Sequence, residues 1–179
     1  MDKLSKLGLK YGTDKIGKHN YLLVYYNLFK NRRESVGKVI EMGIAEGASL
    51  AMWNDFFPNA MIYGADIQPE RVTLELKYPR IQIQKCDQSS QSDLIELLNE
   101  TGSDIDLFID DGSHKPEDQL FTALRLLEIL DKGVVYIIED VKSIGVAVAI
   151  QEALRYNDYK VEIIECGKRY DDRLVICQK

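Results

Sequence analysis

Two acidic clusters carry the side chains best suited to chemistry in this sequence. The first is the run Asp110-Asp111-Gly112-Ser113-His114, which contains one of only two histidines in the chain, and the second is the pair Glu139-Asp140. Short apolar runs, 107–109 and 134–138, directly precede the clusters, and such runs are typical of buried strands in a parallel sheet. Because ligands sit at the carboxyl ends of such strands, we expect the carboxylates and the imidazole to meet at one pocket.

Carboxylates gathered this closely need compensating positive charge. If the two strands are neighbours, either a divalent cation lies among the carboxylates or the side chains turn outward into water. A histidine has an ordinary pKa of about 6.5, so His114 is suited to accept a proton near neutral pH. Two plainer interpretations stay open: His114 as a loop histidine bonded to a backbone carbonyl, and Glu139-Asp140 as a helix cap.

The earlier predicted strands also end in glycine or in polar residues. Gly43 and Gly47 bound the turn after the first strand, where they would let a ligand approach the backbone, while the N–H groups of the next helix favour an anionic group. Asp66 ends the second strand and is placed to accept both hydroxyls of a ribose. Asp87 follows the third strand and could accept from the exocyclic amine of adenine. The three features together indicate a site for an adenosine.

The turn after the first strand lacks the dinucleotide-binding fingerprint G-x-G-x-x-G, because Ala45 and Ala48 stand at two of its glycine positions. The pattern that remains is E-x-G-x-x-x-G, from Glu41 to Gly47. It indicates an adenosine with an amino-acid-like tail instead of a pyrophosphate.

The elements that must position these residues repeat as strand, turn and helix from residue 36 onward. We predict strands at 38–42, 61–66, 80–85, 105–110, 134–138, 160–165 and 173–177, with helices at 48–57, 69–77, 92–99, 117–130 and 144–156. The last two strands are joined by a loop too short for a crossover helix, so they should pair antiparallel. The order predicts an α/β fold, a doubly wound, mostly parallel sheet of seven strands with an antiparallel C-terminal strand.

Residues 1–35 are predicted to form a helical N-terminal extension, on the lid or acceptor side, to a core domain of residues 36–179. Apolar residues recur at helical spacing in 2–10 and 21–33. The stretch 11–21 between them is polar and contains two glycines. It is either a flap over a ligand or a plain connection, and Asp14 and His19 could touch cofactor or acceptor from it.

Composition limits the class of protein. At 179 residues, 45% hydrophobic and 29% charged, the chain is typical of one globular domain. A net charge of −6 and a pI near 5.0 argue against a nucleic-acid partner. The chain has neither a membrane-spanning apolar stretch nor a signal-peptide core near Met1, so we expect a cytoplasmic protein without a membrane partner. The three cysteines lack metal-ligand spacing and are expected to be free thiols.

The motifs of this sequence together resemble those of a known family. The glycine pattern after Glu41, Asp66, Asp87-Gln88 and the seven-strand layout resemble class I S-adenosylmethionine (SAM)-dependent methyltransferases, which have a Rossmann-like fold. More narrowly, the chain is similar to the macrocin and mycinamicin sugar O-methyltransferases of macrolide biosynthesis. The segments that carry this narrower resemblance are Tyr11-Gly12-Thr13-Asp14-Lys15, Trp53 with Phe56-Phe57-Pro58-Asn59-Ala60, Ile109-Asp110-Asp111-Gly112-Ser113-His114 and Ile138-Glu139-Asp140. The segment after Asp140 is shorter than the family pattern, which leaves the acceptor's identity open.

The resemblance implies a Mg²⁺-dependent O-methyltransferase that acts on a hydroxyl of a sugar or glycosylated small molecule. It implies Asp111, Glu139 and Asp140 as the Mg²⁺ ligands, and His114 as the general base beside Asp111. Mg²⁺ prefers such hard oxygen ligands, and a sugar hydroxyl needs both a Lewis acid and a proton acceptor at neutral pH. The residues expected to bind SAM are Glu41, Gly43, Gly47, Asp66, Asp87, Gln88 and Asp110, although Asp110 could instead only shape its loop.

Three alternatives remain open. A catechol-type or other small-molecule methyltransferase of the same fold would bind two adjacent acceptor oxygens to the metal and often uses a lysine base. A non-catalytic SAM-binding module would bind the cofactor with or without His114. NAD-linked oxidoreduction is disfavoured by the missing fingerprint glycines. The expected partner is a carbohydrate-type small molecule, and the oligomeric state is open, a homo-oligomer included.

Overall fold

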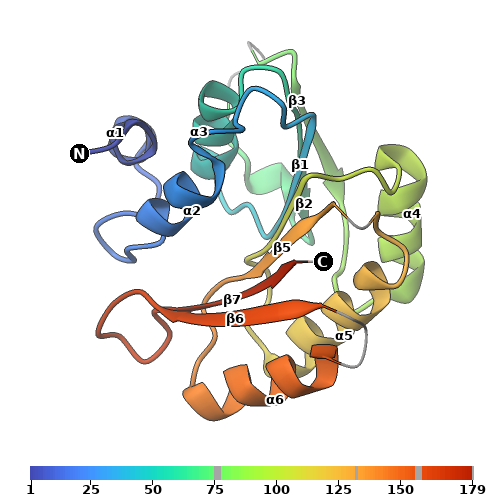
Figure 1. Cartoon of the computed structure of the whole chain (residues 1–179). Coiled ribbons are helices and arrows are strands. Elements are labelled where there is room, and N and C mark those ends of the chain that lie inside the picture. The colour runs from blue at the N-terminus through green and yellow to red at the C-terminus, as the bar shows by residue number, and fades with distance from the viewer. Residues whose placement is uncertain (75–77, 132, 156–158, 179) are drawn as a thin grey trace.

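The computed structural model describes residues 1–74, 78–131, 133–155 and 159–178, and seven strands within them form one sheet (Figure 1). The strand order is β3-β2-β1-β4-β5-β7-β6. The first five strands run parallel, and β7 is antiparallel to both of its neighbours. The strands are β1 (Lys38–Met42), β2 (Met61–Asp66), β3 (Ile81–Lys85), β4 (Leu107–Asp110), β5 (Val135–Ile138), β6 (Lys160–Glu165) and β7 (Arg173–Gln178). The doubly wound, mostly parallel sheet predicted from the sequence is confirmed.

The neighbours of β4 decide which loops share the sheet edge. On one side β4 pairs with β5, and Asp110 lies level with Ile138. On its other side β4 pairs with β1, and Met42 lies level with Asp110. The chain order reverses between β1 and β4, and a ligand crevice forms at such a reversal in an open α/β sheet. The loops after β1, β4 and β5 therefore leave the sheet side by side.

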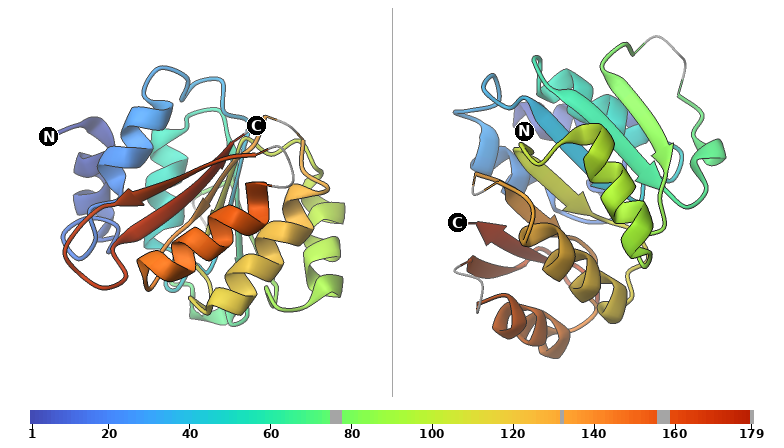
Figure 2. Two further views of the ribbon diagram at one scale, coloured as in Figure 1. Left: turned by 60° about the horizontal axis from the view of Figure 1, so that its bottom comes forward. Right: turned by 90° about the vertical axis from the view of Figure 1, so that its right-hand side faces the viewer.

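Helices cover both faces of the sheet (Figure 2). They are α1 (Lys3–Tyr11), α2 (Leu22–Phe29), α3 (Ala48–Phe56), α4 (Gln91–Thr101), α5 (Pro116–Leu127) and α6 (Ile144–Arg155). The first three lie on one face, where Trp53 and its neighbours form one apolar core. The last three lie on the other face over a second core, in which the rings of Phe108 and Tyr136 stack 4.9 Å apart. The central strands β1, β4, β5 and β7 are thus buried on both sides, which explains their continuous apolar runs in the sequence.

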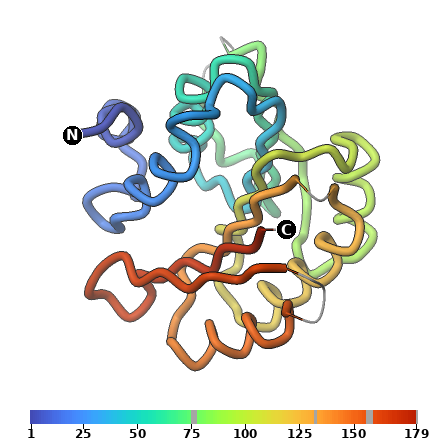
Figure 3. Tube along the Cα trace, in the orientation of Figure 1, coloured from blue at the N-terminus to red at the C-terminus, as the bar shows by residue number. Residues whose placement is uncertain are grey.

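The first two helices pack on the rest of the chain through one apolar face. Tyr21, Leu22, Tyr25 and Phe29 are all at most 1% exposed, because their spacing places them on one side of α2 and its first turn. The loop of residues 12–20 between α1 and α2 lies beside the loop that joins β6 to β7 (Figure 3). His19 Nδ1 is 2.7 Å from a carboxylate oxygen of Asp172 there.

The helix that we predict from residue 69 onward is wrong within the described residues. A single 3-10 turn, η1 (Pro69–Arg71), is all that forms, and residues 75–77 lie outside the described part of the chain. Val72 is extended, and the backbone N–H of Thr73 donates to the carbonyl of Glu46 at 3.2 Å. The β-branched residues disfavour helix, and this segment bonds to the turn after β1 instead.

None of the described helices has the length and apolar character needed to cross a membrane. All three cysteines are free. Burial raises the pKa of each thiol to about 12, so they are poor nucleophiles at neutral pH.

Candidate active site

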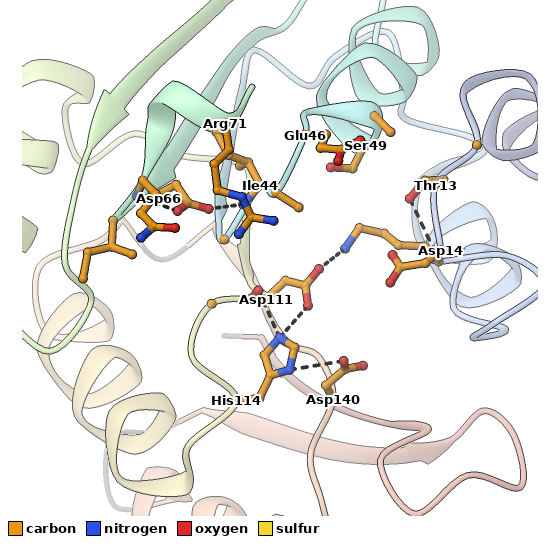
Figure 4. Close-up of a pocket in the computed structure, with 18 residues that line it drawn as sticks. Thr13, Asp14, Ile44, Glu46, Ser49, Asp66, Arg71, Asp111, His114 and Asp140 are labelled. Atoms are coloured by element: carbon orange, nitrogen blue, oxygen red, sulfur yellow. Dashed lines mark hydrogen bonds and ion pairs between the residues drawn. The ribbon is translucent and has the colours of Figure 1, made fainter. Parts of the chain in front are cut away.

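A cavity of about 490 Å³ opens at the carboxyl edge of the sheet (Figure 4). Its wall is built from five segments far apart in the sequence. They are the N-terminal loop (Gly12–Lys15), the turn after β1 (Gly43–Glu46) with the start of α3, the end of β2 with η1, the loop after β4, and Asp140 after β5. The sheet reversal predicts a crevice at this place, and the structure shows one there.

His114 joins the loops after β4 and β5. Its Nε2 lies 3.2 Å from Asp111 Oδ1, and its Nδ1 lies 3.4 Å from Asp140 Oδ2 (Figure 4). Nε2 also lies 3.2 Å from the carbonyl oxygen of Asp111, so the backbone contact of the plainer interpretation is present as well. His114 and Asp140 both have a φ of 53°, a left-handed conformation that costs free energy outside glycine. The structure therefore brings the acidic strand ends and the imidazole together, as predicted.

The main feature that sequence reasoning missed is Lys15. Its ammonium Nζ lies 2.7 Å from Asp111 Oδ2, 2.7 Å from Glu139 Oε2 and 3.0 Å from Glu41 Oε1, and its side chain is only 2% exposed. Burial by itself lowers the pKa of Lys15, but the three carboxylates outweigh it and hold that pKa well above its usual value. The sequence predicts compensation by a divalent ion or by solvent. The structure adds a source of positive charge that this prediction did not include, the Lys15 ammonium from the N-terminal loop.

Glu139 and Asp140 are adjacent in sequence but serve different groups. Both oxygens of Glu139 are engaged, one by Lys15 and the other by the hydroxyl of Tyr25. Burial raises the pKa of Glu139 to about 8, although Lys15 opposes the shift. Asp140 accepts from the Tyr21 hydroxyl at 2.6 Å through Oδ1 and turns Oδ2 toward His114. The hydroxyls of Tyr21 and Tyr25 thus hold the two acidic residues that follow β5 in place.

The donor set fits a hard divalent cation at one point of the cavity wall. Asp111, His114 and Asp140 each offer a ligand atom, and these atoms lie within 4.8 Å of one another. Two of the three predicted metal ligands, Asp111 and Asp140, are therefore close enough to share an ion. Glu139 points instead into the Lys15 cluster, which we define as Lys15 with Glu41, Asp111 and Glu139.

Four of the predicted cofactor residues line the cavity or a smaller one of about 140 Å³ beside it. Gly43 and Asp66 line both cavities, whereas Asp87 and Gln88 line the smaller one. Asp66 accepts backbone N–H groups at both oxygens, from Ile44 at 2.9 Å and from Gln68 at 2.8 Å. Each carboxylate oxygen has a second lone pair, so Asp66 can still accept from a ligand. Sequence reasoning also missed Arg71, whose side chain lies near Asp66 on the same wall (Figure 4).

The other three predicted cofactor residues do not line either cavity. Glu41 is fully buried and accepts from the indole N–H of Trp53 at 3.1 Å, besides its contact with Lys15. Asp110 is fully buried and accepts from the side-chain amide of Gln88 at 3.1 Å, and burial raises its pKa to about 7. Gly47 caps the N-terminus of α3 in a left-handed conformation. The contacts of Glu41 and Asp110 support the loops around the cavity.

Gly43 is required by the protein's own packing. Its φ is 83°, and a Cβ there would lie 2.1 Å from the carbonyl oxygen of Asp111. The turn after β1 and the loop after β4 thus touch backbone to backbone. The glycine that we predict for ligand approach also lets Asp111 reach its position.

No family model matches the chain. Among curated proteins, the 8-demethyl-8-alpha-L-rhamnosyl tetracenomycin-C 2'-O-methyltransferase of Streptomyces olivaceus is 33% identical over 147 residues, which are 78% of this chain and 38% of that protein. The mycinamicin VI 2''-O-methyltransferase of Micromonospora griseorubida is 32% identical over 145 residues, 76% of this chain and 35% of that protein. The chain therefore spans less than two fifths of the length of these relatives.

Solved structures with the same fold include the MycE methyltransferase from the mycinamycin biosynthetic pathway, in complex with Mg and SAH. It superposes with a TM-score of 0.80 at 26% identity and covers 99% of this chain, which spans 55% of that one. A further MycE structure, with Mg, SAH and mycinamycin VI, has a TM-score of 0.79 at 26% identity.

The contacts of His114 predict how its ring titrates. The hydrogen bond to Asp111 raises the pKa of His114, burial opposes it, and the charges of Asp111 and Asp140 add to the rise, to about 9. In chelator-treated protein we expect the NMR signal of the His114 ring to titrate near pH 9. Asp111→Asn should lower the midpoint toward the ordinary value of about 6.5. Since the folded pKa is raised, the stabilisation from this contact is complete below about pH 6.5 and is lost as the pH rises through 9.

Asp118→Asn is the matched control for this titration. Asp118 is a carboxylate that accepts from the Ser113 hydroxyl at 2.7 Å in the same loop, and its removal should leave the His114 midpoint almost unchanged. His114→Asn assigns the signal. A wild-type midpoint near 6.5 would contradict the described contacts.

Proposed function

We propose that this chain, which belongs to the class I SAM-dependent methyltransferases, transfers a methyl group from SAM to a hydroxyl of a sugar or glycosylated small molecule, with Mg²⁺ as a second cofactor. The observation that carries the proposal is that one cavity wall holds both Asp66 and the group of Asp111, His114 and Asp140. The names of the relatives, all sugar or glycoside O-methyltransferases, support the substrate class.

The SAM site of this proposal runs along the edge from β3 to β4. Asp66 would accept the ribose hydroxyls with its remaining lone pairs. Asp87 and Gln88, in the smaller cavity, are suited to the adenine. The amino-acid tail would then lie along Gly43 toward the loop after β4, with the sulfonium methyl facing the wall that carries His114.

Asp111 and Asp140 would hold Mg²⁺, because their oxygens are hard ligands that lie within 4.8 Å of each other at the cavity wall. When bound, Mg²⁺ supplies Lewis-acid chemistry that makes an acceptor hydroxyl more acidic. Glu139 could join this set only by leaving Lys15 and Tyr25, which engage both of its oxygens.

In this proposal His114 is the base that accepts the acceptor's proton. It can do so only in its neutral form, and the carboxylates that hold a proton on it are Asp111 and Asp140. These are the same carboxylates whose charge a divalent ion would compensate. Asp111 and Asp140 contact opposite ring nitrogens, so they also fix the orientation of the imidazole.

Lys15 is poorly suited to be the base, because three carboxylates within 3.0 Å hold its ammonium and keep its pKa above the usual value, and its side chain is only 2% exposed. This point separates the proposal from the catechol-type alternative, in which a lysine often accepts the proton. The transfer itself removes charge, since an oxyanion and a sulfonium become neutral, and a site closed to water favours such a step over bulk solvent. The N-terminal loop, which forms part of the cavity wall, is placed to exclude water.

A methyl-transfer screen tests the proposed function. The purified chain is incubated with SAM and a panel of nucleotide sugars, glycosylated metabolites and catechols, and release of S-adenosylhomocysteine is measured with Mg²⁺ or with a chelator. We expect release with carbohydrate-type acceptors only, abolished by the chelator and restored by added Mg²⁺. Full transfer in chelator would remove the metal from the mechanism. Transfer to catechols alone would favour the catechol-type enzyme, and SAM binding without transfer to any acceptor would favour the non-catalytic module.

Replacing the base should separate chemistry from cofactor binding. We expect His114→Ala to lower the rate of methyl transfer by roughly 10²–10⁴, while the Kd for SAM, measured by calorimetry, barely changes. Lys115→Ala alters the neighbouring residue, which is 62% exposed, and should leave both quantities unchanged. A wild-type rate in His114→Ala would assign the base elsewhere.

A further inference from the structure

We propose that Lys15 is a tethered cation that competes with the divalent ion for the carboxylates of Asp111 and Glu139, and so sets how tightly the site binds Mg²⁺. The inference rests on the proposed function, because the divalent ion belongs to it. It concerns only how this chain's own residues control that ion.

Asp111 is shared between the two groups. Its Oδ2 accepts from Lys15 at 2.7 Å, while its Oδ1 lies 3.2 Å from His114. The Lys15 ammonium therefore already compensates the negative charge of the Asp111 carboxylate, which would hold the ion on the cavity side. Two positive centres on one carboxylate repel each other, so the ammonium must weaken the binding of a divalent ion there.

Glu139 is withheld from the ion by the same ammonium. It follows β5 directly before Asp140, yet its two oxygens accept from Lys15 and from Tyr25. Without Lys15, one oxygen of Glu139 would lose its partner in a buried place, where a bare carboxylate is costly. A divalent ion among Asp111, Glu139 and Asp140 would then be the nearest source of positive charge.

The ammonium is tethered to the cavity wall. Lys15 belongs to the loop of residues 12–20, in which Gly12 and Gly17 take left-handed conformations and Ile16 bridges to Asn20. The backbone of Tyr21 donates to the Lys15 carbonyl at 3.2 Å. The same loop lines the cavity through Gly12 to Lys15. The same conformation of this loop therefore places the Lys15 ammonium among the carboxylates and forms part of the cavity wall.

Calorimetric titration of the metal-free protein with Mg²⁺ tests the inference. Lys15→Met keeps the length of the side chain and removes its charge, and we expect it to bind Mg²⁺ roughly tenfold or more tightly than wild type. Lys18→Met is the matched control, since Lys18 lies in the same loop but is 49% exposed and pairs with Asp14 at 2.9 Å. It removes the same charge from the chain and should change the affinity by about twofold or less.

Lys15→Met leaves Glu41 without its cationic partner, so a second variant guards against failure to fold. Lys15→Met/Glu41→Gln removes that stranded charge and leaves Asp111 and Glu139 intact. We expect it to show the same gain in Mg²⁺ affinity, and addition of Glu139→Gln to abolish most of the gain. Thermal unfolding in chelator establishes that each variant is folded.

The outcomes distinguish this inference from the proposed function. Unchanged or weaker Mg²⁺ binding in the folded Lys15 variants, with clear binding by wild type, overturns the competition and leaves the proposed function standing. If neither wild type nor any variant binds Mg²⁺, the metal-dependent part of the proposed function fails, and the inference fails with it.

Discussion

The structure depends on one buried ammonium. Lys15 contacts Glu41 from β1, Asp111 from the loop after β4 and Glu139 from the end of β5, all within 3.0 Å. The parallel sheet places these acids at a common edge, and burying them unpaired would cost several kcal/mol per ion. The N-terminal loop compensates the charge of these acids by placing Lys15 at that edge. The ion pairs therefore tie the first 20 residues to the centre of the sheet.

This constraint divides the acidic residues into two groups with different properties. In the Lys15 cluster, Lys15, Glu41 and Glu139 are at most 2% exposed, with Tyr25 and Trp53 completing the hydrogen bonds of Glu139 and Glu41. The second group, Asp111, His114 and Asp140, lines the cavity. Asp111 belongs to both, so the charge of the buried cluster acts directly on the group that would meet a ligand. Gly43 also supports the position of Asp111, because a residue with a Cβ at position 43 would collide with the Asp111 backbone.

Much of this arrangement follows from the sequence, for identifiable reasons. Apolar runs that end in acids predict strands with acidic carboxyl ends. Given that the two strands are neighbours, as β4 and β5 are in the structure, Asp111, His114 and Asp140 come together. The position of Lys15 does not follow, because it depends on the path of a loop 96 residues away from Asp111. Glu139 and Asp140 are adjacent in sequence, yet Glu139 turns inward to Lys15 and Tyr25 whereas Asp140, held at a φ of 53°, turns to the cavity. The helix expected from residue 69 does not form within the described residues, because Val72 and Thr73 are β-branched and the segment bonds to the turn after β1.

The most direct test of the buried ion pairs is a measurement of whether Lys15 is charged in the folded protein. Proton–nitrogen NMR of the lysine side chains at neutral pH reports it, with Lys15→Arg to assign the signal. We expect a slowly exchanging ammonium signal for Lys15, protected from water and retained to higher pH than the signals of exposed lysines such as Lys18. A neutral-amine shift for Lys15, or an ammonium that exchanges as fast as that of Lys18, would contradict this expectation.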